Sequence, residues 1–319
     1  MDLRGTKFLV TGGAGFVGSR LVARLVQYGA EVHVLDDLFT GKRENVPEHP
    51  AVRFTVGSVV DPEVVEASMA GADIVIHAAA RNIVVSTRDP REDFQTNIGG
   101  TLNVLLAAKK LNVGRVVYTS SSSIYGNPRH LPVDEEDGYG TLSPYAASKF
   151  AGENYCVAFY ESYGLSTAVV RYSNIYGPGQ SPDNPYCGVV AKFFDAASKG
   201  EPFKIHGDGE QTRDFTYVDD AVEATILAAV LSKAEGRIYN VGTGREVTIN
   251  YLARCVAELF AIPLVVEHID RRDIDNIRRR VMNIERIRRE LRWVPATTLE
   301  EGLRKTKEWF DLQLAPKPQ

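Results

Sequence analysis

The sequence predicts an α/β fold in which a doubly wound parallel sheet is followed by a smaller C-terminal α/β cap. Short, β-branched apolar runs alternate with helical stretches through the first half of the chain, as in successive βαβ units. These runs are largely apolar throughout, which suits strands covered by helices on both faces. A glycine-rich turn directly after the first run indicates the same fold.

Six segments are predicted to be strands because each is short, apolar and rich in β-branched residues. They are residues 7–11, 32–35, 52–56, 74–78, 113–119 and 166–171. Stretches near Val17–Tyr28, Asp89–Leu111 and Pro144–Tyr163 are the predicted crossover helices. Because crossovers of this length join parallel strands, the six strands should form one parallel sheet.

The βαβ rhythm stops after about Asn174, where residues 177–185 form a turn-rich segment of glycines and prolines. We therefore expect a first, cofactor-binding domain over residues 1–174. Residues 175–319 should form mainly a substrate-binding cap, with some of the chain returning to the sheet. The cap is expected to close over the carboxyl edge of the strands, where open α/β sheets bind their ligands.

Composition excludes several classes of protein. The 319 residues are 44% hydrophobic and 24% charged, with a net charge of -4, so we expect no nucleic-acid partner. No apolar run approaches the roughly 18 residues of a membrane span, so we expect no membrane partner. Cys156, Cys187 and Cys255 form neither a zinc spacing nor a disulfide framework, which predicts no metal site and favours the reducing cytoplasm.

Glycines at positions 12, 15 and 18 connect the first predicted strand to the first predicted helix. Gly12 allows the tight turn, Gly15 lets the backbone approach a pyrophosphate, and Gly18 lets helix pack on strand. Phe16 and Val17 open the helix, whose free N–H groups would face the phosphates. The strand, turn and helix context distinguishes this Rossmann-type site from an ordinary glycine turn.

An aspartate at the end of the second strand predicts which dinucleotide binds. The Asp36 carboxylate can accept both ribose hydroxyls of the adenosine half and would repel a 2′-phosphate, which favours NAD over NADP. Asp37 beside it is a second candidate for the same role. The alternative is an ordinary turn aspartate before Gly41, and the neighbouring Lys42 and Arg43 leave room for NADP.

A tyrosine and a lysine form the predicted chemical centre. Tyr145 and Lys149 lie four residues apart, on one face of a helix that Ser143 would cap. A phenol has a pKa near 10, but a nearby ammonium and a positive nicotinamide favour its phenolate. Tyr145 could then take a proton from a substrate hydroxyl as hydride leaves. A hydroxyl from the serine run 120–123 would hold the same oxygen.

Each half of this centre has a simpler explanation on its own. The chain holds 14 tyrosines, so one chance match to Tyr-x-x-x-Lys would not surprise, and the serine run could be only a polar loop. The conjunction with the glycine turn, in the right order, is far more specific.

With these motifs in order, the chain resembles extended short-chain dehydrogenases/reductases of the nucleotide-sugar epimerase and dehydratase group, most of all UDP-glucose 4-epimerases. The similarity runs over about residues 7–310. The motifs that carry it are the glycine turn 11–18, Asp-Asp-Leu 36–38, His-Ala-Ala-Ala 77–80, Tyr145-x-x-x-Lys149, Arg-Tyr-Ser-Asn 171–174 and Arg-Asp-Phe 213–215. The resemblance implies an NAD enzyme that oxidises and re-reduces a nucleotide sugar in place.

The resemblance also implies residue roles. Ser121 would be the catalytic hydroxyl, Tyr145 the acid/base, and Lys149 the residue that holds the nicotinamide ribose. The further residues implied to line the cofactor are Ser58, Ala78, Ala80, Asn97 and Tyr172. Those implied to bind the substrate are Val84, Ser121, Ser122, Asn174, Arg213, Arg272 and Asp275.

Two of these substrate-binding residues are implied to contact the phosphates of the substrate. Asn174 would meet the diphosphate, and Arg213 would pair with a phosphate through its guanidinium fork. A surface ion pair of Arg213 with Asp214 or Asp219 is the alternative.

Departures from the family pattern narrow the reaction. Dehydratase relatives carry Asp-Glu, and decarboxylase relatives Glu, where this chain has Ser122 and Ser123. Without a carboxylate there, dehydration is disfavoured. Glucuronate-specific epimerases tend to have Arg at the place of Ser181, although Arg280 is another source of positive charge. Ser58 replaces the usual aspartate of the adenine contact.

The predicted function is 4-epimerisation of a UDP-hexose of the UDP-glucose/UDP-galactose type, through a transient 4-keto sugar. The alternatives are a ketoreductase, a UDP-glucuronate 4-epimerase or a dTDP-sugar dehydratase. A non-catalytic NAD-sensing regulator is a further alternative, although it would not need Ser121, Tyr145 and Lys149. The resemblance implies a homodimer through the helices 89–111 and 144–163, but core packing explains their apolar faces equally well.

Overall fold

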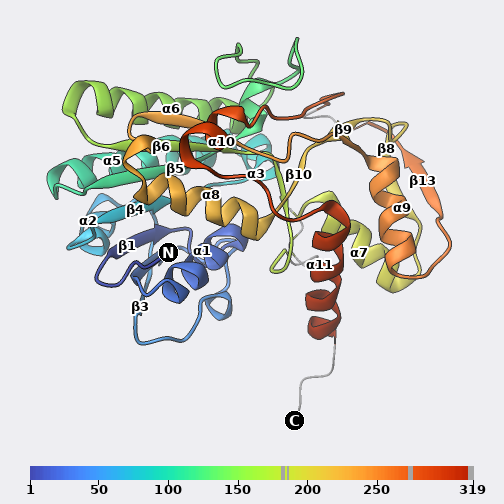
Figure 1. Cartoon of the computed structure of the whole chain (residues 1–319), viewed down its shortest axis with the longest axis horizontal. Coiled ribbons are helices and arrows are strands. Elements are labelled where there is room, and N and C mark those ends of the chain that lie inside the picture. Colours follow the sequence, from blue (N-terminus) through green and yellow to red (C-terminus); the bar gives the residue numbers. More distant parts are fainter. Residues whose placement is uncertain (181–183, 185–186, 272–275, 315–319) are drawn as a thin grey trace.

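The computed structural model describes residues 1–180, 184, 187–271 and 276–314. Its larger part is a sheet between two layers of helices, and a smaller group of helices and short strands lies beside it (Figure 1). The N-terminus starts in the larger part, and the final helix α11 belongs to the smaller one (Figure 1). Within these described ranges, no helix is long and apolar enough to cross a membrane.

The sheet has seven parallel strands in the order β11-β6-β5-β4-β1-β2-β3. Their bounds are β1 Lys7–Thr11, β2 Glu31–Asp36, β3 Val52–Val56, β4 Ile74–His77, β5 Arg115–Ser121, β6 Thr167–Tyr172 and β11 Arg237–Val241. The strand order reverses direction between β1 and β4, where two halves of a doubly wound sheet meet. The predicted fold class is thus confirmed, and each of the six predicted strands is present.

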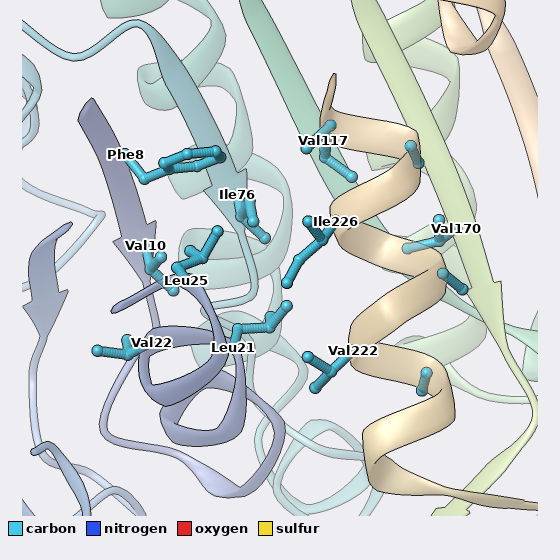
Figure 2. Packing of buried hydrophobic residues seen from close by; sticks show 14 of the residues in the cluster. Phe8, Val10, Leu21, Val22, Leu25, Ile76, Val117, Val170, Val222 and Ile226 are labelled. Carbon is cyan, nitrogen blue, oxygen red and sulfur yellow. The ribbon is translucent and has the colours of Figure 1, made fainter. Parts of the chain in front are cut away.

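Helices α1 Phe16–Gln27 and α8 Val218–Val230 cover one face of the sheet. Their buried side chains meet those of β1, β4, β5 and β6, as Figure 2 shows for Leu21, Val22 and Leu25 of α1 and Val222 and Ile226 of α8. Helices α2 Pro62–Met69, α5 Gly100–Lys110 and α6 Pro144–Tyr163 cover the other face. The burial of both faces explains why the strands are apolar throughout.

The predicted helix 89–111 is interrupted. It consists of α4 Pro90–Asp93, a π-helical segment Phe94–Gly99 and then α5. A π-helical turn inserts an extra residue per turn and is often found at functional sites. Here it brings the buried side chains of Asp93 and Asn97 to the interior beside α6. Periodicity alone could not show this change.

The second half of the chain contributes more to the sheet than its irregular pattern indicates. Helix α8 packs on β5 and β6, edge strand β11 pairs with β6, and α10 Glu285–Leu291 packs on β11. In the first half of the chain, the short helix α3 Ile83–Arg88 follows β4.

The smaller part holds an aromatic core of its own. Helices α7 Val189–Lys199 and α9 Ile249–Leu259 pack on β8 Phe203–His206, which pairs in parallel with β13 Val266–Ile269, and α11 Leu299–Leu314 packs on α9 (Figure 1). Two small ladders connect it to the sheet: β7 Asn174–Tyr176 with β10 Phe215–Tyr217, and β9 Thr212–Arg213 with β12 Val247–Thr248.

A buried ion pair joins α6 to the sheet. Arg171 of β6 is fully buried, and its Nη2 lies 2.8 Å from Glu153 of α6, which is 2% exposed. The Arg171 Nη1 donates to the Tyr125 hydroxyl (2.7 Å) and to the Glu135 carbonyl (2.9 Å). With both charges buried and all these partners in place, the pair sets the position of α6 along β6.

Glu153→Leu leaves the Arg171 guanidinium buried without its carboxylate, which typically costs about 3–5 kcal/mol. We expect the free energy of unfolding in urea to fall by about that amount. The double variant Glu153→Leu with Arg171→Met removes both charges and should recover most of the loss. A single variant within about 1 kcal/mol of the wild type would show that the pair does not hold α6.

Candidate active site

The glycine turn after β1 has no room for side chains. Gly12 has a φ of +71° and a β-carbon there would lie 2.6 Å from the Ala79 nitrogen. A β-carbon on Gly18 would lie 2.0 Å from the Gly12 oxygen, so both positions require glycine. Gly15 is the N-cap residue of α1 and offers no capping side chain. The first N–H groups of α1 therefore remain available for an anion.

Asp36 is buried at the end of β2. One carboxylate oxygen accepts the Ala14 N–H (2.9 Å) and the other accepts the Leu38 N–H (2.8 Å). Burial raises the pKa of Asp36, and these two N–H groups oppose that rise. The carboxylate thus ties the glycine turn to the loop after β2.

A cleft opens over this turn. Six residues predicted to bind the cofactor line it, namely Gly12, Gly15, Asp36, Asp37, Ala78 and Ala80. Phe39 and Arg81 line it too, although the sequence did not single them out. A turn without side chains, an uncapped helix terminus and a carboxylate at the far end together fit a dinucleotide. These residues would hold the pyrophosphate and the adenosine ribose of NAD.

Four other predicted cofactor residues are not among the residues that line this cleft. Ser58 accepts the Val60 N–H, while its two neighbours line the cleft. Phe16 and Val17 are half-buried at the start of α1. The Tyr172 hydroxyl lies 2.6 Å from the Thr225 hydroxyl of α8, on the sheet face that α1 also covers.

Asn97 fixes one rim of the cleft. Its Oδ1 accepts the Arg81 N–H (2.7 Å), and its Nδ2 donates to the Arg81 carbonyl (3.1 Å). The same Nδ2 donates to Asp93 (2.6 Å), whose Oδ1 also accepts the Ser86 hydroxyl (2.5 Å) and the Ser148 hydroxyl (2.9 Å). Because Ser148 precedes Lys149, this buried network connects the cleft rim to α6.

Helix α6 begins where the sequence predicts. The Ser143 hydroxyl accepts the Ala146 N–H (3.2 Å), and Pro144 occupies the first helical position. Tyr145 is half-buried in the first turn, and Lys149 is 3% exposed in the second. The helix packs on β5 and on the turn Ser122–Tyr125 that follows it, so all of these residues gather at the carboxyl edge of β5.

Electrostatics around Lys149 are set by burial. Desolvation lowers the pKa of Lys149 to about 8, opposed by the carboxylates of Glu153 and Asp93. Its Nζ lies 4.5 Å from the centroid of the Tyr118 ring. At neutral pH the ammonium therefore keeps its charge beside Tyr145. Burial, with the Lys149 charge, lowers the pKa of His77 to about 3, so His77 is neutral between Thr11 and Thr101.

The serine run lies at the strand exit. Ser121 ends β5, and its hydroxyl donates to the Ser123 hydroxyl (3.1 Å) and accepts the Ser123 N–H (3.1 Å). Ser122 is 1% exposed. Hydroxyls therefore stand at positions 121, 122 and 123, and Ser121 can turn from its neighbour to another oxygen at little cost.

The predicted phosphate ligands lie where the cap meets the sheet. Arg213 of β9 donates through Nη1 to the carbonyls of Thr212 and Ile277, both at 2.8 Å. The Asn174 N–H donates to the Asp214 carbonyl (2.9 Å). Asp219, the alternative partner of Arg213, is paired with Arg20.

Asp214 holds three segments together around these ligands. One carboxylate oxygen accepts the N–H and hydroxyl of Thr243 (2.8 and 2.6 Å), and the other accepts the N–H groups of Gly244 (3.0 Å) and Met282 (3.2 Å). It thereby ties β9 to the loop after β11 and to the segment that contains Arg280, which is 4% exposed.

Val84 is 42% exposed on α3. Arg272, Asp275 and Ser181 lie outside the described residues. Asp93 and Arg81 had no motif to reveal them, whereas Asp214 lies within the Arg-Asp-Phe motif and was considered only as an ion-pair partner.

Comparisons with known proteins agree with this site. A model of the NAD dependent epimerase/dehydratase family matches residues 8–242. The UDP-glucose 4-epimerase of Mycolicibacterium smegmatis is 38% identical over 310 residues, 95% of this chain and 97% of that protein. The UDP-N-acetyl-alpha-D-glucosaminuronate decarboxylase of Bacillus cytotoxicus is 35% identical over 321 residues, again 95% and 97%.

A solved structure is similar over the whole chain. The UDP-glucose 4-epimerase of Thermotoga maritima, with UDP-glucose, superposes with a TM-score of 0.92 at 36% identity, covering 97% of this chain and 100% of that one. The chain belongs to the NAD dependent epimerase/dehydratase family. It is an NAD-dependent enzyme of the nucleotide-sugar epimerase/dehydratase superfamily. Because its relatives include both epimerases and a decarboxylase, the reaction has to be argued from the site.

Asp36→Ala removes the carboxylate predicted to bind the adenosine ribose. We expect NAD affinity to fall by an amount on the order of 1.5–3 kcal/mol, as for other lost charge-assisted hydrogen bonds. The variant should also lose the preference for NAD over NADP, because no charge then repels the 2′-phosphate. Calorimetric titration of both proteins with both dinucleotides measures this, and wild-type protein that binds NADP more tightly than NAD would contradict it.

Lys149→Met should stabilise the cofactor-free protein at pH 7 while abolishing turnover. In the folded protein the pKa of Lys149 is about 8, below its ordinary value of 10.5, so folding disfavours the charged form of Lys149. Asp93 and Glu153 keep their other partners in the variant. Wild-type stability should rise as pH increases from 8 to 10.5, and the advantage of the variant should shrink. Urea unfolding at pH 7 and pH 9.5 tests this, and a destabilised variant at pH 7 would contradict it.

Proposed function

We propose that this enzyme inverts C4 of a UDP-hexose of the UDP-glucose/UDP-galactose type, through a transient 4-keto sugar. The observation that carries the proposal is the exit of β5. There, Ser121 ends β5, which packs against α6 with Tyr145 in its first turn and Lys149 in its second, and serines occupy the two positions where a carboxylate would serve another reaction.

In the proposed mechanism, side chains of this enzyme transfer the proton. Bound NAD would supply the hydride chemistry at C4, as the acceptor in the oxidation and the donor in the reduction from the opposite face. Tyr145 takes the proton of the 4-hydroxyl and later gives it back, and the Lys149 charge supports the phenolate. Ser121 holds the same oxygen and relays the proton.

Hydroxyls at positions 122 and 123 argue against elimination. Dehydration needs one group to remove a proton next to the ketone and another to protonate the leaving hydroxyl. Serine hydroxyls are far too weakly acidic and basic for either task at neutral pH. With C5 and C6 untouched, the ketone can only be reduced again.

Arg213 and Asn174 support the choice of a nucleotide-sugar diphosphate. Both come from small ladders between sheet and cap, and the Asp214 carboxylate ties those ladders to neighbouring loops. A guanidinium there suits a phosphate. The similar T. maritima structure holds UDP-glucose, which supports uridine as the base.

The direct experiment incubates purified enzyme with UDP-glucose, UDP-galactose, UDP-glucuronate or dTDP-glucose and identifies products by NMR. We expect UDP-glucose and UDP-galactose to interconvert without release of reduced cofactor. A stable 4-keto-6-deoxy sugar from dTDP-glucose, or a decarboxylated pentose from UDP-glucuronate, would show that another residue supplies the missing acid.

We also propose a homodimer through α5 and α6, which lie side by side. Leu106 on α5 and Val157 on α6 are 50% and 40% exposed, and burying them would favour pairing. Cys156, Cys187 and Cys255 form no disulfide in the described part of the chain, which supports a cytoplasmic location. Light scattering coupled to gel filtration measures the mass, and a monomer at micromolar concentration would contradict the dimer.

Tyr145→Phe removes one oxygen and leaves the ring and helix in place. We expect kcat to fall by about 10²- to 10⁴-fold, as for a lost general base, with little change in KM. Ser121→Ala should lose less, because water or Ser122 partly replaces it, and the two losses should not add because both groups act on one proton. Steady-state kinetics and a thermal melt decide this: near-wild-type turnover in a well-folded Tyr145→Phe would end the proposed mechanism.

A further inference from the structure

An arginine that the sequence did not single out crosses the cofactor cleft. Arg81 follows β4 on one rim, and its Nη2 lies 2.8 Å from Asp37 on the other rim, in the loop after β2. Its Nε lies 2.7 Å from Glu92 of α4. Gly12 lines the same cleft, and its backbone packs closely on Ala79, where a β-carbon on Gly12 would lie 2.6 Å from the Ala79 nitrogen.

The Arg81 side chain is held on every side. It is only 12% exposed, and its guanidinium carbon lies 4.0 Å from the centroid of the Phe39 ring. The Arg81 N–H donates to the Asn97 Oδ1 and the Arg81 carbonyl accepts from the Asn97 Nδ2, so the backbone of Arg81 is fixed as well. The neighbouring carboxylates raise the pKa of Arg81 despite its burial. An exposed ion pair has neither this backbone anchor nor three partners.

On the opposite rim, the loop after β2 places Asp37 and Phe39 against the Arg81 side chain. Leu38 adopts a φ of +59°, a left-handed conformation that is unfavourable for a residue with a β-carbon. Hydrogen bonds from the Leu38 N–H to Asp36 and from the Phe39 N–H to Asp37 hold this turn. The turn leaves the second oxygen of Asp37 for Arg81 and places the Phe39 ring against it.

We propose that Arg81, bound to Asp37 and Glu92 and stacked on Phe39, is a strap that retains NAD in its cleft. A dinucleotide between the two rims can leave only when the strap opens, so the strap governs how fast the cofactor dissociates. An enzyme that regenerates its cofactor within each turnover gains from slow dissociation. The assignment concerns the cofactor alone and does not depend on which sugar is the substrate.

The test measures the dissociation rate of NAD from the holoenzyme. Protein loaded with radiolabelled NAD is chased with excess unlabelled NAD, and retained label is followed by rapid filtration. Arg81→Met should release NAD at least ten times faster than the wild type. Arg88→Met is the matched control, because Arg88 is exposed at the end of the adjacent α3, and its rate should equal that of the wild type.

Two further measurements separate a strap from a general effect on folding. Asp37→Asn should accelerate release as well, and adding it to Arg81→Met should give little further increase, because both break one contact. Raising the salt concentration should speed release from the wild type by screening the ion pairs, with a smaller effect on Arg81→Met. Release from Arg81→Met within twofold of the wild-type rate, in protein with a normal melting temperature, would overturn the proposal.

Discussion

The buried ion pair between Arg171 of β6 and Glu153 of α6 is the contact on which the arrangement of the site depends. Glu153 lies one helical turn beyond Lys149 and two turns beyond Tyr145, so fixing Glu153 against the sheet also fixes the helical face that carries both. The same guanidinium reaches the Tyr125 hydroxyl, just past the serine run. One pair thus positions the proposed base Tyr145, the Lys149 cation and the strand exit together.

The buried groups around α6 also determine the charge state of Lys149. A buried ammonium is costly, and burial alone lowers the pKa of Lys149, yet the carboxylates of Asp93 and Glu153 keep it charged near neutral pH. Each carboxylate is bonded elsewhere, to the Asn97–Ser148 network or to Arg171, so neither forms a neutralising pair with the lysine. The Lys149 charge can therefore act on the phenol of Tyr145. Burying this charge lowers the stability of the folded protein, as is common at active sites.

Much of this was predictable from local patterns. Helix 144–163 and strands 7–11 and 52–56 were predicted with their observed bounds, because a serine-proline cap and β-branched runs are local signals. A return of some of the chain to the sheet was expected, but the strand that returns, β11, was not identified, and neither the π-helical turn before α5 nor the bonds of Asp214 were predicted. Each depends on neighbours far apart in sequence, and a single aspartate or arginine carries no periodic signal. Ser122 was predicted both as a substrate-binding residue and as a departure from a motif.

The most direct measurement follows the hydrogen on C4. UDP-glucose deuterated at C4 is converted in ordinary water, and the UDP-galactose formed is analysed by NMR and mass spectrometry. Oxidation and reduction of the same carbon in one closed site predict that the deuterium stays on C4, inverted, with none released. Deuterium found in the solvent or on another carbon of the sugar would contradict inversion in place.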